Sequence, residues 1–453
     1  MVRLRRGHGS LQGALFGLLT GWSVMRVALF ESASAGFGPI AQLRPDFELI
    51  CGQFSARERA IRTLSPSDWG VFLREELAET WREQHPESHV NDIGWLKQDT
   101  TLLLCGRWLA RAQTIREIEP HTVGVIDGTV VWLTAHPAEA ELFDAIGWES
   151  ALYEMARTRT RVPASGRLVS FAWELSEQNS AQLEADFVSQ SSGSQLSDPA
   201  GKIALVGPRE RVSIDPTARL EPFVVLDATR GPVSIGAGAA IQSFTRLEGP
   251  CHVGIGAQLF RANVRAGTTI GAYCRVGGEI EASILHSHVN KYHDGFLGHS
   301  YVCPWVNLGA LTTNSDLKND YSNVRVPLEG KSIDTRLTKV GCFIGDHTKT
   351  GLGSLFNTGS SIGVMCMILP GGELLPRHIP SFTAVWHGEL ADAIPFERNL
   401  AAARTAMGRR NHELTGAQER LLRFVHGATQ TERAEAIALA REKRAAARAP
   451  ARS

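Results

Sequence analysis

Apolar residues recur every six positions over a long central part of the chain, with a single five-residue step between Leu259 and Val264. A period of six matches neither an α-helix nor an alternating strand. It predicts a parallel β-helix, in which six residues form one flat side of a coil and the apolar residue points inward. Chance periodicity in another globular fold is the alternative, and the number of registers argues against it. The registers are Ile235, Ile241, Leu247, Val253, Leu259, Val264, Ile270 and Val276, then Ile344, Thr350, Phe356, Ile362 and Ile368.

The predicted β-helix covers residues 204–385, and its period fails between Asn314 and Thr338, where charged residues gather. This segment is expected to form a loop outside the coils, and such loops often shape sites on a rigid scaffold. Beyond Trp386 the sequence becomes helical and ends in a run rich in Ala, Arg and Glu. We expect a short helical C-terminal tail over 386–453, and for its last part, 431–450, a solvated or frayed helix is the simple interpretation.

Residues 25–190 alternate between strand and helix patterns, which favours an α/β domain with a layered sheet. Strands are expected at 26–30 and 101–104, and the Asp127-Gly128 pair within 123–131 is typical of a hairpin. Ser55 and Glu58 have the spacing of a capping box at a helix start. The segments expected to be helical are 69–81, 137–157 and 172–188.

The segments that flank this domain have a different composition. Residues 1–24 carry three arginines before an apolar run, as in a signal peptide, but Gly and Gln interrupt the run. We interpret 1–24 as an N-terminal extension, with export and membrane anchoring as alternatives. Residues 191–203 are polar, rich in Ser and Gly, and predict a linker to the β-helix.

Composition narrows the class of protein. Forty-seven basic residues balance forty-seven acidic ones, so no net field favours nucleic acid or an anionic membrane. The seven cysteines are scattered without the spacing of a metal site or a disulfide framework. After residue 24 no apolar run reaches the roughly 18 residues that span a bilayer. A cytoplasmic protein with no nucleic-acid partner and no membrane partner is expected.

A polar segment between two coil registers carries the candidate chemistry. Histidine is a side chain suited to accept a proton near neutral pH, so His293 is a candidate base, and Asp294 directly after it could orient the ring. Lys291 is a cation suited to a phosphate, whereas Asn307, one coil later, can bond sugar hydroxyl groups. Asn314 opens the irregular loop and is a further substrate-binding candidate. Ordinary surface polarity is the alternative for any one of these residues.

In these motifs the chain resembles a divergent branch of the GlmU-like sugar nucleotidyltransferases. The resemblance covers about residues 25–385, and its β-helix motifs are longer and more specific than the N-terminal ones. The motifs that carry it are 26–59 and 171–187 in the first half, and 290–298, 307–310, 319–324, 345–347, 356–359 and 379–382 in the second.

The resemblance implies a nucleotidyltransferase-like α/β domain followed by a left-handed, hexapeptide-repeat β-helix acyltransferase, usually a homotrimer that binds acetyl-CoA. Lys291 and His293 nearly reproduce the family's Lys-x-x-His motif, with one residue fewer between them. The resemblance makes His293 the catalytic base, assigns Asn307 to the substrate, and assigns Ala310 to acetyl-CoA. Phe296 stands where the family has a tyrosine, so that hydroxyl group is missing.

The N-terminal half departs from the family pattern. The expected Gly-rich, basic phosphate loop is replaced by 30–38, which has no cation, and no Mg²⁺-binding Asp follows the strand at 101–104. Asp127 could substitute for it, although Asp-Gly usually forms a turn. Mg²⁺ is expected only if this domain is active. The arginines expected to contact phosphate are Arg44, Arg57 and Arg107, for which structural salt bridges are the alternative.

The sequence therefore predicts acetyl transfer from acetyl-CoA to an amino-sugar phosphate such as glucosamine-1-phosphate, within UDP-N-acetylglucosamine biosynthesis. A UDP-sugar pyrophosphorylase activity is expected if the first domain is active, with nucleotide sugars as ligands. One alternative is a non-catalytic trimeric scaffold. The other is a β-helix carbonic anhydrase, whose zinc would need three imidazoles from among His286, His288, His293 and His299.

Overall fold

The computed structural model describes residues 26–32, 34–119, 122–188, 203–391 and 394–448. The expected extension 1–24 and all but the last residue of the expected linker 191–203 lie outside these ranges. The chain forms two compact units: an N-terminal unit of residues up to 32 and 56–168, and a β-helix unit of 33–55 and 169–453. This division of the chain differs from the single border expected near 190. Segment 33–55 and the helix at 172–188 pack with the coils, because their side chains form hydrogen bonds with residues of the coils.

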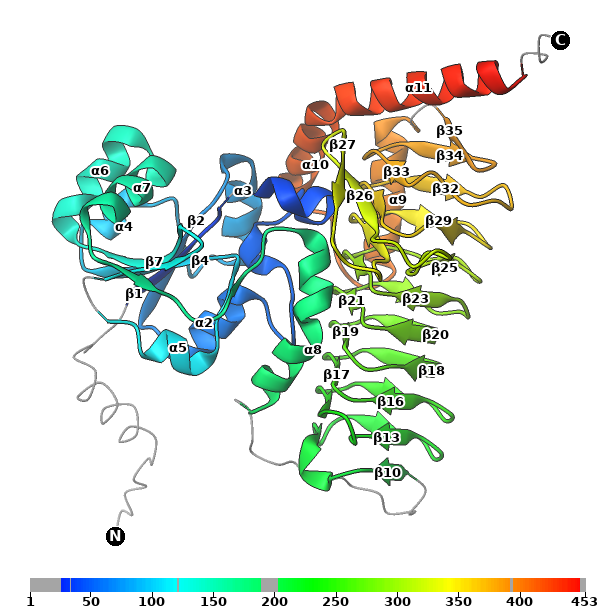
Figure 1. The fold of residues 1–453 in the computed structure, drawn as a ribbon, viewed down its shortest axis with the longest axis horizontal. Coiled ribbons are helices and arrows are strands. Elements are labelled where there is room, and N and C mark those ends of the chain that lie inside the picture. The colour runs from blue at the N-terminus through cyan, green and yellow to red at the C-terminus, as the bar shows by residue number, and fades with distance from the viewer. Residues whose placement is uncertain (1–25, 33, 120–121, 189–202, 392–393, 449–453) are drawn as a thin grey trace. The chain divides into compact units, whose positions relative to one another are not determined.

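The N-terminal unit is built on a mixed seven-stranded sheet with the order β3-β2-β1-β4-β7-β6-β8 (Figure 1). Its strands β3, β2, β1 and β4 run parallel, as an α/β fold predicts. The strands are β1 Arg26–Phe30, β2 Asp68–Phe72, β3 His89–Val90, β4 Thr101–Cys105, β5 Trp108–Leu109, β6 Val123–Ile126, β7 Thr129–Ala135, β8 Arg161–Pro163 and β9 Arg167–Leu168. The α-helices are α2 Ala56–Leu64, α3 Glu75–Gln84, α4 Ile93–Leu96, α5 Ala112–Arg116, α6 Ala140–Ile146 and α7 Trp148–Thr158, and η3 Pro137–Glu139 is a 3-10 turn.

Two local predictions in this unit have opposite outcomes. The hairpin is confirmed, because β6 and β7 pair antiparallel through Asp127 and Gly128, both with positive φ. The helix predicted at 69–81 is wrong in its first half, where β2 lies, and only α3 is helical. Four of the five β2 residues are buried. A short apolar run of this kind has no periodicity that separates a strand from a buried helix.

The β-helix unit consists of stacked three-sided coils whose strands form a ladder (Figure 1). The sheet that marks each turn has the order β11-β14-β17-β19-β21-β24-β28-β31-β33, with parallel neighbours. The strands are β10 Ala204–Val206, β11 Val212–Ile214, β12 Arg219–Leu220, β13 Val225–Asp227, β14 Val233–Ile235, β15 Ala240–Ile241, β16 Arg246–Glu248, β17 Cys251–Val253, β18 Gln258–Val264, β19 Thr268–Ile270, β20 Arg275–Glu281, β21 Ile284–Leu285, β22 Asn290–Lys291, β23 Phe296–Gly298, β24 Tyr301–Val302, β25 Thr313–Asn314, β26 Arg325–Leu328, β27 Lys331–Asp334, β28 Cys342–Ile344, β29 Lys349–Thr350, β30 Leu355–Phe356, β31 Ser360–Ile362, β32 Met367–Leu369, β33 His378–Ile379, β34 Ala384–Trp386 and β35 Glu389–Ala391.

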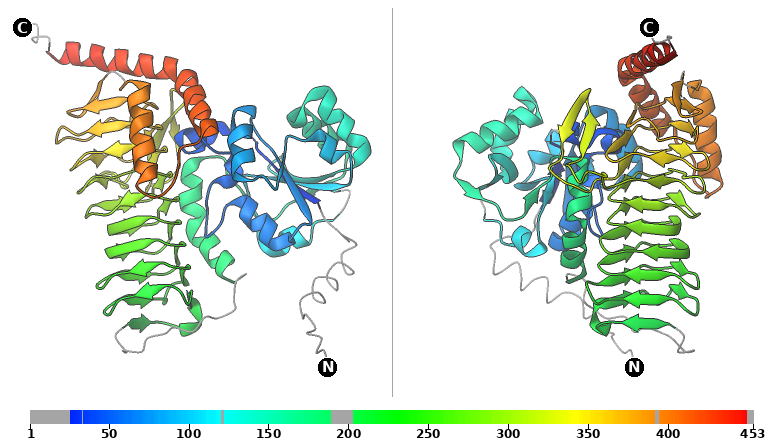
Figure 2. Two further views of the ribbon diagram at one scale, coloured as in Figure 1. Left: turned by 180° about the vertical axis from the view of Figure 1, so that it is seen from behind. Right: turned by 45° about the vertical axis from the view of Figure 1, so that its right-hand side comes forward.

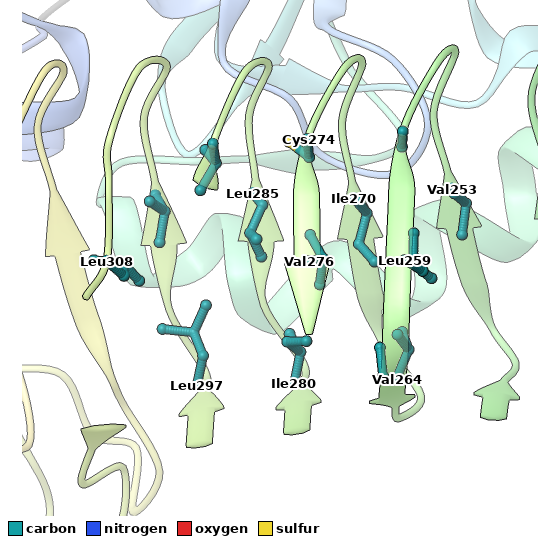
Figure 3. Close-up of a cluster of buried hydrophobic side chains, with 14 of the residues drawn as sticks. Val253, Leu259, Val264, Ile270, Cys274, Val276, Ile280, Leu285, Leu297 and Leu308 are labelled. Atoms are coloured by element: carbon teal, nitrogen blue, oxygen red, sulfur yellow. The ribbon is translucent and has the colours of Figure 1, made fainter. Parts of the chain in front are cut away.

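The six-residue period is the core of this unit. Val253, Ile270 and Leu285 are partners on successive strands and point into one continuous cluster of buried residues (Figure 3). The stack continues across the irregular loop, because Val302 pairs directly with Ile344. The loop carries a hairpin of β26 and β27 outside the coils, as predicted.

The remaining elements of this unit pack on the outside of the coils, and the last helix crosses the end of the stack (Figures 1 and 2). They are the 3-10 turns η1 Ser34–Ala41, η2 Asp46–Glu48 and η4 Arg209–Arg211, and the helices α8 Ala172–Val188, α9 Phe396–Gly408, α10 Gly416–Ala428 and α11 Gln430–Arg448. The tail is not a solvated or frayed helix over its whole length. Arg433 at the start of α11 is buried and donates to the backbone oxygen of Ser381, 3.1 Å away, and Arg444 binds Glu389.

In the described part of the chain, no helix has both the length and the apolar character needed to cross a bilayer.

Candidate functional site

A row of polar side chains follows one flat side of the coils. Arg275 pairs with Asn290 on the next strand, and bridges continue this register through Asn307 to Lys349. We call Arg275, Asn290, Asn307 and Lys349 the polar ladder. The side-chain amide of Asn290 donates to Oδ1 of Asn307, 2.6 Å away, which fixes two of its members. Asn307, expected to bind substrate, therefore lies in an ordered polar row.

The polar ladder and helix α9 enclose a cavity of about 750 Å³. This volume lies in the range of small-molecule sites. Of its lining, sequence reasoning considered Asn307 for the substrate and His288 for zinc. The side formed by α9 and the turn after it could not be placed against the coils from the sequence. The lining residues are Arg275, His288, Asn290, Trp305, Val306, Asn307, Lys349, Ala401, Ala402, Thr405, Ala406, Arg409 and Arg410.

His293 lies in the exposed corner after β22. Its ring meets the Tyr292 ring edge-on, with 4.9 Å between centroids. The next coil continues the same corner, since the Leu311 N–H donates to the Asp294 carbonyl, 2.9 Å away, and places Ala310 in the adjacent turn. The structure therefore brings His293 and Ala310 to one corner. The Asp294 side chain makes no hydrogen bond to His293, so the expected orientation of the ring by Asp294 is not seen.

Lys291 does not lie on the surface. It is 2% exposed, and its Nζ donates to the backbone oxygens of Gly277 and His293, each 2.9 Å away. Burial lowers the pKa of Lys291 to about 8, although the Asp294 charge opposes this shift. The phosphate-binding role predicted for Lys291 does not fit this geometry. Its bond to the His293 carbonyl instead fixes the turn that carries His293.

Asn314 is also an interior residue, and its predicted role in substrate binding does not fit. It is 2% exposed. Its Oδ1 accepts from the Gly298 N–H at 2.8 Å, and its Nδ2 donates to the Gly298 carbonyl at 3.0 Å. Both ends of the amide are thereby occupied in holding adjacent coils together.

A histidine–aspartate pair that sequence reasoning missed lies at another corner. His299 Nδ1 and Asp316 Oδ2 are 2.7 Å apart. Burial would raise the pKa of Asp316, but the bond to His299 outweighs it and the pKa is lowered. His299 lines a second cavity of about 220 Å³. A Cβ on Gly298 would lie 2.5 Å from Asp316 Oδ2, so a glycine is needed there. His299 and Asp316 are seventeen residues apart, about one coil, and this spacing could have predicted that they are neighbours.

The corner beside the polar ladder carries a stack of rings. His288 lies 4.3 Å from Trp305 between centroids, nearly parallel to it, and both line the larger cavity. Tyr273, His288, Trp305 and His347 share the third position of this corner and all have positive φ, which costs non-glycine residues energy. Ring stacking offsets part of that cost.

The four histidines considered for zinc lie in different surroundings. His286 is half-buried and bonds the Glu48 carbonyl, and desolvation followed by the charge of Arg44 lowers its pKa to about 3. His288 Nε2 lies 3.2 Å from His412 Nε2, His293 is exposed, and His299 binds Asp316. Within the described ranges, no group of three or more His, Cys, Asp or Glu side chains could hold a metal ion.

The three arginines expected to contact phosphate lie in different surroundings. Arg44 belongs to the β-helix unit and forms a two-armed ion pair with Asp346. Burial would lower the pKa of Arg44, but the Asp346 carboxylate raises it above its ordinary value. The role predicted for Arg44 is therefore wrong, and segment 33–55 packs on the coils where a phosphate loop was expected.

Arg57 and Arg107 belong to the N-terminal unit. Arg57 lies over the rings of Trp69 and Trp81, at 5.6 and 5.8 Å from the centroids, in cation–π contacts. Arg107 follows β4 at the carboxyl edge of the parallel strands, and its Nε donates to the Ser32 hydroxyl at 2.9 Å. Ligands of open α/β sheets bind at such edges. Asp127 is an exposed turn residue, as its Asp-Gly context indicates.

Residues 27–195 match the family model described as sugar nucleotidyl transferase. The bifunctional sugar-1-phosphate nucleotidylyltransferase/acetyltransferase of Sulfurisphaera tokodaii is 33% identical over 20% of this chain and 23% of its own length. The bifunctional protein GlmU of Methanocaldococcus jannaschii is 31% identical over 24% and 26% respectively. The chain thus spans about a quarter of the length of these relatives. The matches support a GlmU-like family, as the motifs predict.

A solved UDP-N-acetylglucosamine acyltransferase from Arabidopsis matches 47% of this chain and 76% of its own, at 15% identity and a TM-score of 0.25. At that score it carries no argument, and the β-helix is assigned from the strand registers given above.

Proposed function

We propose that this protein transfers an acyl group from acetyl-CoA to an amino-sugar phosphate, with the reaction at the corner that carries His293. The observation that supports it best is the convergence of His293 and Ala310 on one exposed corner of adjacent coils. Asn290 of the polar ladder, which pairs with Asn307, lies three residues before His293 in the chain. The name of the Sulfurisphaera tokodaii relative describes sugar-1-phosphate nucleotidyl transfer and acetyl transfer.

His293 acts as the general base. The acceptor amine is protonated near neutral pH and must lose a proton before it attacks the thioester carbonyl. The C–N bond forms as the C–S bond breaks, and CoA leaves as the thiol. Lys291 has a positioning role, because it holds the His293 carbonyl from inside the coil. Asn307 presents its amide to the sugar hydroxyl groups.

The test measures acetyl transfer to glucosamine-1-phosphate by the full chain. His293→Ala is expected to lower kcat by about 10²–10⁴-fold. His299→Ala is the matched control, since it removes an imidazole from another corner and leaves His293 in place. An unchanged rate in His293→Ala would overturn the assignment. A large loss in His299→Ala alone would transfer the role of base to the His299–Asp316 pair.

We further propose a homotrimer in which a neighbouring chain completes this corner. Tyr292, Leu311 and Leu352 follow one another along it and are 39%, 62% and 73% exposed. Apolar residues in a continuous exposed row are typical of an interface.

For the N-terminal unit we propose nucleotide-sugar binding at the carboxyl edge of β1, β2 and β4. Arg107 is the candidate phosphate partner there, whereas Arg57 lies in its two ring contacts. Mg²⁺ would need carboxylates at this edge, and Glu31 there is already bonded to Arg74. A thermal shift of the full chain by UTP or a UDP-sugar that Arg107→Gln abolishes would support binding at this edge. A shift that survives Arg107→Gln would contradict the assignment.

A further inference from the structure

The cavity between the polar ladder and α9 has an excess of positive charge. Arg275 and Lys349 contribute from the coils, Arg409 and Arg410 contribute from the turn that follows α9, and none of the lining residues is acidic. The carboxyl end of α9 supplies a partial negative charge of roughly half a unit. Most of the positive charge therefore has no protein counterpart in the cavity.

The sequence of α9 explains why there is a cavity here at all. On one face of α9, Ala401 is followed one turn later by Thr405, and Ala402 by Ala406; Arg409 and Arg410 continue these two rows in the turn after Gly408. The alanines and Thr405 have small side chains and leave space above the polar ladder. Each row ends in an arginine.

The bonds inside the cavity hold the cations without neutralising them. Arg410 donates to the carbonyl of Tyr273, and Lys349 donates to the carbonyls of Trp305 and His347, each at 3.3 Å. Arg275 Nε is buried and has no hydrogen-bond partner among the described residues.

Titration behaviour agrees with this picture. Burial and then Arg275 lower the pKa of Arg410. Burial alone lowers the pKa of Lys349 to about 8, so Lys349 is still largely charged at pH 7.

The position of these groups restricts the ligand. Arg275 and Arg410 face each other across one end, Lys349 lies three strands along the polar ladder from Arg275, and two amides lie between. Three strand spacings amount to roughly 14 Å, more than one phosphate group can span. We infer that this cavity binds a diphosphate-linked sugar, with the diphosphate between Arg275 and Arg410 and the sugar hydroxyl groups at Asn290 and Asn307. Nucleoside diphosphate sugars and CoA both carry this chemistry.

The experiment is calorimetric titration of the full chain with inorganic pyrophosphate, UDP-N-acetylglucosamine, CoA and N-acetylglucosamine. Pyrophosphate is expected to bind, and one of the two diphosphate-linked ligands is expected to bind at least tenfold more tightly because it also reaches the amides. N-acetylglucosamine alone should not bind measurably. The tighter of the two larger ligands identifies the source.

Arg275→Gln and Arg410→Gln change opposite walls and should each weaken binding at least tenfold. Arg398→Gln is the matched control, because Arg398 is exposed on α9 and does not line the cavity. Ala402→Phe fills the space without removing charge and should also abolish binding, which covers the case that an arginine variant fails to fold.

Absence of binding by all three phosphate ligands would overturn the inference. So would equal weakening by Arg398→Gln, or binding that survives both Arg275→Gln and Ala402→Phe. The readout is binding rather than turnover, so a failure of the proposed acyl transfer would leave this result unaffected.

Discussion

The ion pair between Arg44 and Asp346 offers a direct test of what segment 33–55 does. Arg44 Nη1 donates to Asp346 Oδ2 at 3.1 Å and to the Ile40 carbonyl at 2.9 Å, and Nη2 binds the other carboxylate oxygen. The side chains are only 12% and 4% exposed. Arg44→Met leaves a carboxylate buried without its partner. Removal of one member of a buried pair costs about 3–5 kcal/mol.

For a domain of this size, such a loss lowers the melting temperature by on the order of 10 °C. The assay is thermal unfolding of the full chain at one scan rate, with Arg44→Met, Asp346→Leu and the double variant compared. The double variant removes both charges, so most of the lost stability should return. If Arg44 instead bound phosphate, Arg44→Met would leave the melting temperature within about 2 °C of the parent and weaken UTP binding. That pair of results would refute the structural role.

Three further outcomes are expected. Because the pKa of buried Lys291 is lowered to about 8 from 10.5, the unfolded chain binds more protons between these values, so stability should rise with pH across that window. Lys291→Met should remove the contribution of Lys291 to this rise in the free energy of unfolding, roughly 3 kcal/mol. Urea unfolding at pH 7.5 and 10 measures the rise, and the same rise in the parent and the variant would contradict the burial of Lys291. The pKa of Asp316 is lowered, so its stabilisation is present above the unfolded value and is lost as pH falls below about 4; Asp316→Asn should flatten that acid limb of the melting curve, and an unaltered limb would contradict the pair. Sedimentation equilibrium at micromolar concentration should give a trimer, which Leu352→Glu should dissociate, whereas a monomeric parent chain would argue against assembly through this corner.

The sequence alone determined the β-helix. Inward positions of a coil recur at a fixed spacing and must be apolar or internally bonded, so the six-residue period alone predicts the fold. The same six-residue period could have corrected the predicted roles of two residues. Lys291 lies six residues from both Leu285 and Leu297, and Asn314 lies six beyond Leu308, so both occupy inward positions. Both residues had instead been expected to bind substrate at the surface.

Only the tertiary structure decided which distant segments meet the coils. No local pattern pairs Arg44 with Asp346, or brings Arg410 from the turn after α9 opposite Arg275, because these contacts depend on how a loop and a helix pack on a rigid surface. The strand at 68–72 was missed for a related reason, since burial on both faces removes the alternation that marks a strand. Period is a property of neighbouring residues in the chain, whereas the charge balance of a cavity depends on residues that folding brings together.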